Sequence, residues 1–476
     1  MFSRPIWYDE AFSILFSQKG PAAMLYGTVT ASGGAAAEVH PLAYYYLLWE
    51  WMRIWGDSLV AARLLSVLLG MGVVVLAYLL GRELWGEEAW LLPFGLVVLS
   101  PFQIHYSQEI RMYALLTALL LLATLAMWRG IHTRQIRWWL TFGLAAALAQ
   151  YTHNLAFTFL LPLALTPVFL REWRALRAVV LSGLGALVLY IPWLFHLPSQ
   201  MAMVEGGYWI PAPTLTRLFT TLLAFVVNLP IAERWLPLAL FATLFPTALA
   251  VWQSGKAGRE KLPHFRRGLW LAYLAISPPL LLLLVSLWRP VYIERALLPS
   301  GVFFLLWLGW ALRNAGLPRA MFALALVLLL PSMVMGIVQH VSYDSFPYAP
   351  WEGIGKYLTQ RVETGEVILH SNKLTMLPMV YAAPDLPQHY LVDTPGSGTD
   401  TLSLPTQQVL GLMADPNPEV AVGEARGAWF ILFSREIDEY QALGFGSHPQ
   451  LDWLEGHFHR EQVTTWEDVL LYEYTR

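Results

Sequence analysis

The sequence has no cysteine, and only 13% of its 476 residues are charged. The absence of cysteine excludes disulfide bonds, thiolate nucleophiles and cysteine-based zinc sites. The charged fraction is about half of that in an ordinary soluble domain. The net charge of −3 leaves no positive excess for binding nucleic acid, so we expect no nucleic-acid partner.

Apolar residues, in contrast, make up 57% of the chain, which contains 22 tryptophans. A helix needs about 20 apolar residues to cross the ~30 Å hydrocarbon core of a bilayer. We therefore predict a polytopic α-helical protein of the cell membrane, with about ten spans in the lipid bilayer. The spans are expected at 60–81, 89–104, 112–128, 138–152, 155–170, 178–196, 235–252, 269–288, 296–312 and 320–339.

Two features near the N-terminus depart from this pattern. The segment 41–55, PLAYYYLLWEWMRIW, is too short to cross and carries Glu50 and Arg53 among its aromatic residues. This composition favours a helix that lies flat on the membrane surface. The chain also begins directly at a polar motif with Asp9 and Glu10, and we expect a membrane helix to precede this motif in a longer protein.

Basic residues indicate the orientation of the spans. Arginine and lysine are concentrated in alternate loops, mainly at 129–137, 171–177 and 256–267, which we expect to be cytoplasmic. The opposite loops contain few basic residues, among them Arg111 and Arg295, and these lie inside polar motifs. Both termini are then expected on the outer side of the membrane.

The composition changes after about Val341, where acidic residues, proline and glycine become frequent. We therefore predict a transmembrane domain at 1–341 and a small soluble α/β domain, extracytoplasmic, at 342–476. No glycine-rich phosphate loop follows any predicted strand, which argues against a nucleotide site. The strands are expected at 366–371, 388–392, 428–434 and 467–474, and the helices near 350–362, 405–414, 434–443 and 450–458.

Three polar stretches fall on the same outer side in this topology. They are WYDEAFS at 7–13, EVHP at 38–41 and HYSQEIRMY at 105–113. Ionisable groups are costly at a membrane boundary and usually face a cavity. These stretches therefore supply most of the candidate site residues.

The stretches and their order resemble the membrane glycosyltransferases that use polyprenyl-phosphate sugars, which include protein O-mannosyltransferases and lipid A aminoarabinose transferases. The resemblance covers most of 1–340 and rests on WYDEAFS, on HPLAYYYLL followed by VAARLLSVLLG, on SQEIRMYAL and on PVYIERALLPS. It implies a GT-C fold and an inverting enzyme that moves a hexose or pentose from a polyprenyl-phosphate carrier to an acceptor hydroxyl at the outer membrane face. It identifies neither the sugar nor the acceptor.

The resemblance also implies roles for particular residues. Asp9 corresponds to the acid at the catalytic centre, with Glu10 beside it. His40 matches a His-Pro-Pro stretch only in part, because leucine replaces the second proline. Glu109 corresponds to a third acid, although here it precedes Arg111 and does not follow it. The residues assigned to substrate or lipid-phosphate binding are Glu38, His40, His105, Glu109, Arg111 and Arg295.

The chemistry of such a transfer agrees with these residue types. An acceptor hydroxyl needs a base, which a carboxylate supplies, and a departing phosphate needs cations, which arginine supplies. A substrate with a lipid tail also accounts for a site at a bilayer surface. No cofactor is assigned. The acidic residues make a divalent cation a candidate, but the sequence does not define their geometry, so no metal-binding residues are assigned.

Other interpretations of the same residues stay open. The acids at 9–10 suit the charged start of a helix, and Glu109 with Arg111 suits a structural ion pair. The Arg295 side chain could extend from a helix end to the membrane–water interface. His40 and His105 could be ordinary residues of that interface. A transporter or lipid flippase is the alternative function, because many helices with polar residues near one face also suit substrate passage. A non-catalytic anchoring protein is a third.

Overall fold

The computed structural model describes residues 4–30, 40–86, 90–200, 210, 213–261, 264–314, 317–393 and 401–476. Contacts divide the chain into two compact units. Unit 1 comprises Met1–Ala62, His196–Trp209 and Tyr343–Arg476, and unit 2 comprises Arg63–Phe195 and Ile210–Ser342. Segments from both ends of the sequence therefore share one unit.

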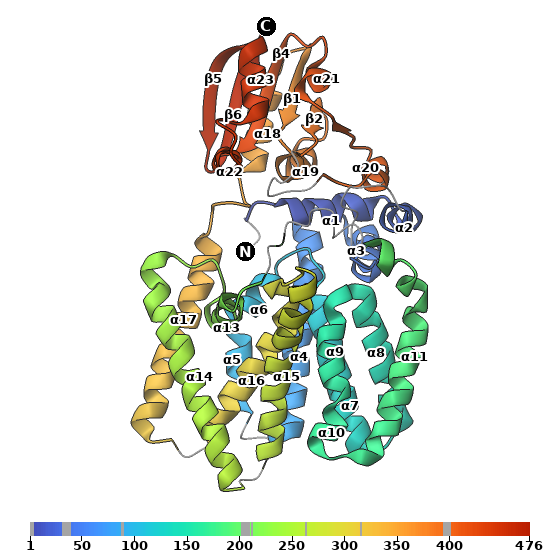
Figure 1. Ribbon diagram of the computed structural model, residues 1–476, viewed down its shortest axis with the longest axis vertical. Helices are drawn as coiled ribbons and strands as arrows, with labels where there is room; N and C mark the ends of the chain where they lie inside the picture. Colours follow the sequence, from blue (N-terminus) through green and yellow to red (C-terminus); the bar gives the residue numbers. More distant parts are fainter. Residues whose placement is uncertain are drawn as a thin grey trace. The chain divides into compact units, whose positions relative to one another are not determined.

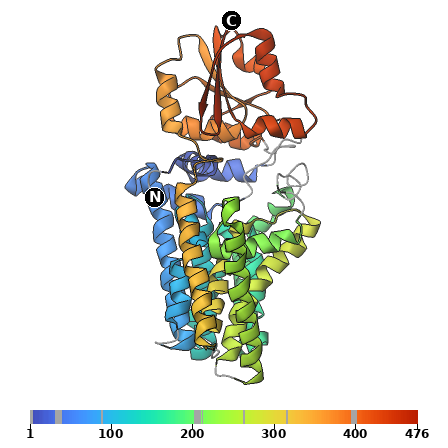
Figure 2. The same cartoon turned by 90° about the vertical axis from the view of Figure 1, so that its left-hand side faces the viewer.

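Unit 2 is a bundle whose longer helices run side by side (Figure 1, Figure 2). Seven helical stretches among the described residues are long and apolar enough to cross a membrane. They contain α4 (Leu59–Trp85), α7 (Tyr113–Thr133), α11 (Leu176–Leu194), α14 (Leu236–Arg259), α15 (Phe265–Trp288), α16 (Leu298–Asn314) and α17 (Arg319–Ser342). The prediction of a multi-pass α-helical membrane protein is confirmed.

The helices differ in how much apolar surface the protein buries. Each of these stretches contains an apolar segment of 18 residues. In the stretch with α16, 94% of this segment is buried inside the protein, whereas in the stretch with α11 only 17% is buried. Helix α16 therefore forms the centre of the bundle. Helix α11 presents leucine and valine side chains outward, as expected of a helix that contacts lipid.

Two of the predicted spans, 89–104 and 155–170, are built from shorter helices. The prediction of one helix at 89–104 is wrong, because the stretch divides into α5 (Leu91–Val98) and α6 (Pro101–Tyr106). The backbone at Ser100 is extended, and its hydroxyl accepts a hydrogen bond from the Gln103 amide, which starts a new helix at Pro101. The remaining elements of unit 2 are α8 (Ile136–Thr152), η1 (Asn154–Ala156), α9 (Phe157–Ala164), α10 (Thr166–Leu170), η2 (Trp173–Ala175), α13 (Thr216–Val227), η3 (Glu233–Trp235) and η4 (Glu294–Leu297).

The C-terminal part of unit 1 contains a six-stranded sheet in the order β3-β2-β1-β4-β6-β5. The strands are β1 (Glu366–His370), β2 (Gln388–Leu391), β3 (Ala414–Asp415), β4 (Gly427–Phe433), β5 (His459–Trp466) and β6 (Val469–Thr475). Strands β1 to β4 are parallel, and β6 is antiparallel to both β4 and β5. The four predicted strands coincide with β1, β2, β4 and β6, so the predicted α/β class is confirmed.

Helices cover both faces of this sheet. They are α18 (Trp351–Thr359), α19 (Lys373–Ala382), α20 (Leu404–Leu410), α21 (Pro418–Val422), α22 (Arg435–Ala442) and α23 (Pro449–His457). On one face Phe430 joins a core with Leu454 of α23, and on the other the ring of Trp351 lies 5.8 Å from that of Phe433. Because both faces are covered, every residue of β4 is buried.

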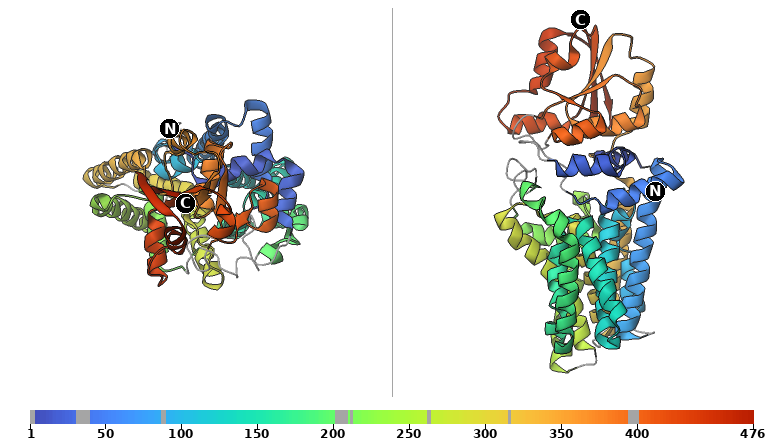
Figure 3. Two further views of the ribbon diagram at one scale, coloured as in Figure 1. Left: turned by 90° about the horizontal axis from the view of Figure 1, so that it is seen from above. Right: turned by 90° about the vertical axis from the view of Figure 1, so that its right-hand side faces the viewer.

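Three N-terminal helices complete unit 1, namely α1 (Tyr8–Gln18), α2 (Pro21–Val29) and α3 (Ala43–Trp55). Helix α1 lies along α19, and α2 contacts α20 (Figure 1, Figure 3). The Thr406 hydroxyl donates a hydrogen bond to the Gly27 carbonyl at 3.1 Å, and a Cβ on Gly27 would lie 3.2 Å from Val409. Composition alone assigned residues 1–62 to the membrane domain, whereas their contacts group them with 343–476.

Candidate functional site

The residues predicted for the site fall in both compact units. Those in unit 1 are Asp9, Glu10 and His40, and those in unit 2 are His105, Glu109, Arg111 and Arg295. Glu38 lies outside the described residues. His40 is half-buried and stands shortly before α3.

The two acids of unit 1 lie in the first turn of α1. Only 6% of the surface of Asp9 and 1% of that of Glu10 is exposed. Neither caps the helix, because the N-cap is Trp7. The helix N-terminus stabilises negative charge on both, so the helix-start interpretation accounts for their charge but not for their burial. Helices α3 and α19 pack against α1.

His105 and Glu109 form a hydrogen-bonded pair in unit 2. His105 Nε2 lies 3.0 Å from Glu109 Oε1, and both side chains are buried. The pair forms because α6 ends at Tyr106, after which the chain turns and returns Glu109 to the histidine. Glu109 Oε2 is also buried and has no hydrogen-bond partner among the described residues. The hydrogen-bond partner of Glu109 is thus His105. The alternative left open by the sequence, a structural ion pair of Glu109 with Arg111, did not anticipate this partner.

Two residues that the sequence analysis did not single out complete this group, which we call the His105 cluster: His105, Glu109, Asn228 and His340. Asn228 is the C-cap of α13, and its Nδ2 lies 3.1 Å from His105 Nδ1. His340, near the end of α17, places its ring 4.1 Å from that of His105. A signal for His340 was present, because ionisable residues in apolar spans are usually functional. No sequence pattern pointed to Asn228.

Aromatic rings connect Arg295 to the His105 cluster. The guanidinium carbon of Arg295 lies 5.4 Å from the centre of the Tyr113 ring. The Tyr113 ring is 5.3 Å from that of Tyr106, which stacks on His105 at 4.4 Å. Arg111, two residues before Tyr113, is almost fully buried. The structure therefore brings Arg295 from a distant part of the sequence to the HYSQEIRMY stretch.

The turn that carries Arg295 is fastened to α13. The guanidinium of Arg217 donates a hydrogen bond to Glu294 at 2.9 Å. The hydroxyls of Thr221 and Tyr292 lie 2.7 Å apart and share a hydrogen bond. Because α13 also ends at Asn228, one helix positions both Arg295 and the amide that contacts His105.

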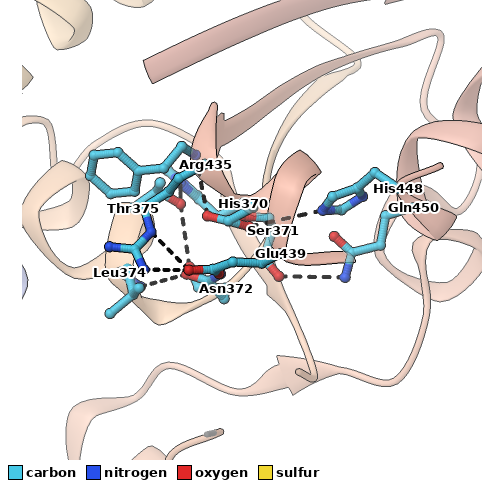
Figure 4. Close-up of polar contacts among 11 residues, drawn as sticks. His370, Ser371, Asn372, Leu374, Thr375, Arg435, Glu439, His448 and Gln450 are labelled. Carbon is cyan, nitrogen blue, oxygen red and sulfur yellow. Dashed lines mark hydrogen bonds and ion pairs between the residues drawn. The ribbon is translucent and has the colours of Figure 1, made fainter. Parts of the chain in front are cut away.

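A second buried polar group lies in the α/β part of unit 1, at the carboxyl end of β1 (Figure 4). His370 Nδ1 is 3.0 Å from the Thr375 hydroxyl, and Nε2 is 3.2 Å from Gln388 Oε1. Burial lowers the pKa of His370 to about 3, so this histidine is neutral at physiological pH. With both ring nitrogens bonded, His370 has a structural role between β1 and the start of α19.

Metal binding was left open by the sequence. Among the residues that the structure describes, no group of three or more His, Asp or Glu side chains is arranged to hold a metal ion. We therefore assign no residues to the candidate divalent cation, and its role is left to experiment.

A protein-family model matches part of the chain. Residues 39–196 match the model described as dolichyl-phosphate-mannose-protein mannosyltransferase. The matched region contains His40, His105, Glu109 and Arg111, and it ends well before Arg295. Less than half of the chain is covered, and the acids of α1 precede the match.

Curated relatives are similar over a comparable length. Proteins named undecaprenyl phosphate-alpha-4-amino-4-deoxy-L-arabinose arabinosyl transferase are 28% identical in Pseudomonas fluorescens and 29% identical in Pseudomonas aeruginosa, over 180 residues. These alignments cover 36% of this chain and 32% of the relatives. The chain thus matches about a third of the length of these relatives.

Solved structures are similar along almost the whole chain. ArnT from Cupriavidus metallidurans in the apo state has a TM-score of 0.58 at 13% identity, covering 99% of this chain and 93% of that one. The structure of the same protein bound to undecaprenyl phosphate also has a TM-score of 0.58 at 13% identity, covering 99% of this chain and 94% of that one. The Archaeoglobus fulgidus oligosaccharyltransferase has a TM-score of 0.55 at 12% identity, covering 98% of this chain and 70% of that one. At these identities the similarity shows the fold, and the predicted GT-C-like architecture is confirmed, as is the resemblance to membrane glycosyltransferases.

Proposed function

We propose that this chain is an inverting glycosyltransferase that moves a hexose or pentose from a polyprenyl-phosphate carrier to an acceptor hydroxyl at the outer face of the cell membrane. The observation that carries the proposal is the His105 cluster, a buried polar group in a bundle of apolar helices. Such groups are costly and typically serve a substrate. The names of the relatives, which act as transferases on undecaprenyl phosphate sugars, support the same donor class.

Each predicted residue has a chemical role in this proposal. The acceptor oxygen attacks the anomeric carbon opposite the phosphate, forms the new glycosidic bond, inverts the centre and releases the lipid phosphate. Asp9 accepts the proton of the acceptor hydroxyl, and Glu10 orients its neighbour. Arg111 and Arg295 bind the phosphate, because a guanidinium can engage two of its oxygens. The residues kept for substrate binding are Glu38, His40, His105 and Glu109.

The transporter alternative has less support. The matched family model and the curated relatives are all named as transferases. A flippase would move its lipid intact, whereas the proposed reaction breaks the bond between sugar and phosphate. The two functions are therefore separated by the fate of the lipid.

A transfer assay tests the proposal directly. Purified protein is incubated with labelled undecaprenyl-phosphate mannose or undecaprenyl-phosphate aminoarabinose and with a mixture of lipid, peptide and polysaccharide acceptors. We expect release of free undecaprenyl phosphate together with label in one acceptor class. A parallel reaction with a chelator tests the divalent cation. Movement of intact labelled lipid across vesicles, with no lipid phosphate released, would favour the flippase.

We also propose that the connection between α14 and α15 is cytoplasmic and that Tyr343–Arg476 is extracytoplasmic. The positive charge at 256–267 supports this orientation. Because the chain has no cysteine, one introduced thiol gives labelling without background. Suitable sites are Arg259→Cys at the end of α14 and Gln441→Cys in α22, both exposed.

In right-side-out vesicles, we expect an impermeant maleimide to label the cysteine at 441 at once and the one at 259 only after permeabilisation. Full labelling of both sites by a permeant maleimide is the control for reactivity. Labelling of position 259 in sealed vesicles, with position 441 protected, would reverse the assigned orientation.

A further inference from the structure

The carboxylate of Glu109 is held at one oxygen only. Oε1 lies 3.0 Å from His105 Nε2, whereas Oε2 is buried with no hydrogen-bond partner among the described residues. A buried carboxylate oxygen without a donor is costly. We infer that Asn228 is a positioning residue that, through His105, directs Glu109 Oε2 toward a hydroxyl or amino group of the substrate sugar. The inference rests on the proposed function and names the part of the substrate that this cluster binds.

The contacts of His105 determine where its proton lies. Nε2 faces a carboxylate oxygen, which only accepts hydrogen bonds, so Nε2 carries the proton and donates it to Glu109. In the neutral ring, Nδ1 then offers a lone pair. It faces the amide of Asn228, whose Nδ2 at 3.1 Å is closer than Oδ1 at 3.4 Å. Asn228 therefore donates to Nδ1 and holds the tautomer that binds Glu109.

The backbone at Asn228 indicates that its side chain serves more than the turn. Its φ is 63° and its ψ is 169°, a region that glycine adopts easily and other residues rarely. Glycine would end α13 here with less strain. The position thus carries an amide side chain although its backbone conformation favours glycine, and the contact of that side chain is with His105.

Close helix packing keeps the His105 ring in one orientation. Tyr106 stacks on one side of the ring at 4.4 Å, and His340 lies 4.1 Å from its centre. Helix α17 can bring His340 this close because Gly336 has no side chain. A Cβ there would lie 2.1 Å from the Val227 carbonyl oxygen, next to Asn228. The ring therefore cannot easily turn away from Asn228 and Glu109.

The charges around the cluster assign Glu109 to the sugar and not to the phosphate. The elements packed against α6 contribute His340 on α17, Arg217 on α13, which pairs with Glu294, and Arg111 directly before α7. Arg295 of η4 lies over the Tyr113 ring, which contacts Tyr106. The arginines at 111 and 295 suit a phosphate. A carboxylate repels phosphate and accepts hydrogen bonds from hydroxyl or ammonium groups, which the sugar supplies.

The test compares lipids with and without a sugar. Binding of undecaprenyl phosphate, undecaprenyl-phosphate mannose and undecaprenyl-phosphate aminoarabinose is measured for the wild type and for Asn228→Gly. We expect the variant to melt at or above the wild-type temperature and to bind undecaprenyl phosphate normally. The extra affinity for the sugar-bearing lipid should fall by about 10-fold, the scale of one hydrogen bond to a charged group. If the variant loses extra affinity for the mannose lipid, the group that contacts Glu109 is a sugar hydroxyl. If it loses extra affinity for the aminoarabinose lipid alone, that group is the amino group.

Three further variants test whether Asn228 acts by positioning His105 and Glu109 or only by stabilising the fold. Glu109→Gln should cause the same loss, and the double variant should be no worse than either single one, because both changes act on one interaction. Arg134→Gly is the matched control, since Arg134 is also a helix C-cap with positive φ but is exposed and lies at the opposite end of α7 from Tyr113. It should leave all three affinities unchanged.

The inference is overturned if Asn228→Gly retains the wild-type preference for a sugar-bearing lipid, or if its loss adds to that of Glu109→Gln. If Asn228→Gly does not fold, His105→Phe keeps an aromatic ring beside Tyr106 and His340 and should show the same loss. A wild-type protein that neither prefers a sugar-bearing lipid nor releases lipid phosphate contradicts the proposed function itself. The two failures are therefore distinguishable.

Discussion

Asp9→Asn should lower the rate of sugar transfer by ~10²–10⁴-fold, the usual contribution of a general base. The amide has nearly the shape of the carboxylate, but it lacks the negative charge and the oxygen lone pair that accept the hydroxyl proton. Because Asp9 lies in the first turn of a helix held by α3 and α19, the substitution should leave the fold and donor binding intact. Initial rates at saturating donor, with binding of undecaprenyl phosphate measured separately, give the comparison.

Glu10→Gln is the matched control for this experiment. Glu10 is the next residue of the same turn and is also buried, so the two variants disturb the local structure to a similar extent. We expect the milder effect at Glu10 if it only orients its neighbour. Transfer by folded Asp9→Asn at close to the wild-type rate would show that Asp9 is not the base, and Glu10 and Glu109 would then be tested.

Gly309→Ala should destabilise unit 2 by about 1–3 kcal/mol, the usual range for overpacking a close contact. A Cβ on Gly309 would lie 2.5 Å from Pro93 Cα and 2.7 Å from Pro93 N, both backbone atoms of α5. A backbone cannot move aside as a flexible side chain can, so α5 and α16 must separate. We expect a lower melting temperature for the variant in detergent, with unfolding monitored by tryptophan fluorescence.

The same substitution elsewhere in the bundle serves as the control. Gly185, inside α11, has nothing within 4 Å of the added Cβ. Gly185→Ala should therefore be neutral or stabilise its helix by about 0.5–1 kcal/mol, because alanine is the better helix former. Equal melting temperatures for the variants at 309 and 185 would show that the contact between α5 and α16 does not limit stability.

The sequence predicted the elements whose composition is distinctive over many residues. The apolar run of α4 and the buried strand AWFILFS, which coincides with β4, are examples. It failed where a few residues decide the outcome, as at Ser100 and Pro101, where a cap and a proline divide an apolar run. It also missed β5, HREQVTTW, because this polar edge strand is mostly exposed and pairs with β6 alone. No apolar alternation marks such a strand.

The candidate site was predictable to the extent that ionisable residues stand out in an apolar sequence. His105 and Glu109 were found in this way, and Arg295 was found through the resemblance of PVYIERALLPS to a family motif. Asn228 was not, because its role depends on the distance between α13 and α6 and on a backbone conformation that the sequence does not reveal. The approach of His340 likewise depends on Gly336, which fits against a carbonyl oxygen of another helix.

The order of synthesis gives the composition of unit 1 a further meaning. Helices α1 to α3 are translated before unit 2, but their partners α19 and α20 are translated only after the whole of unit 2. The sheet that carries these partners is completed last, because β6, which pairs along the full length of β4, ends at Thr475. A premature stop codon just before β6 would therefore leave the described helices of unit 2 and α19 translated, yet leave the sheet that carries α19 without the strand that pairs with β4.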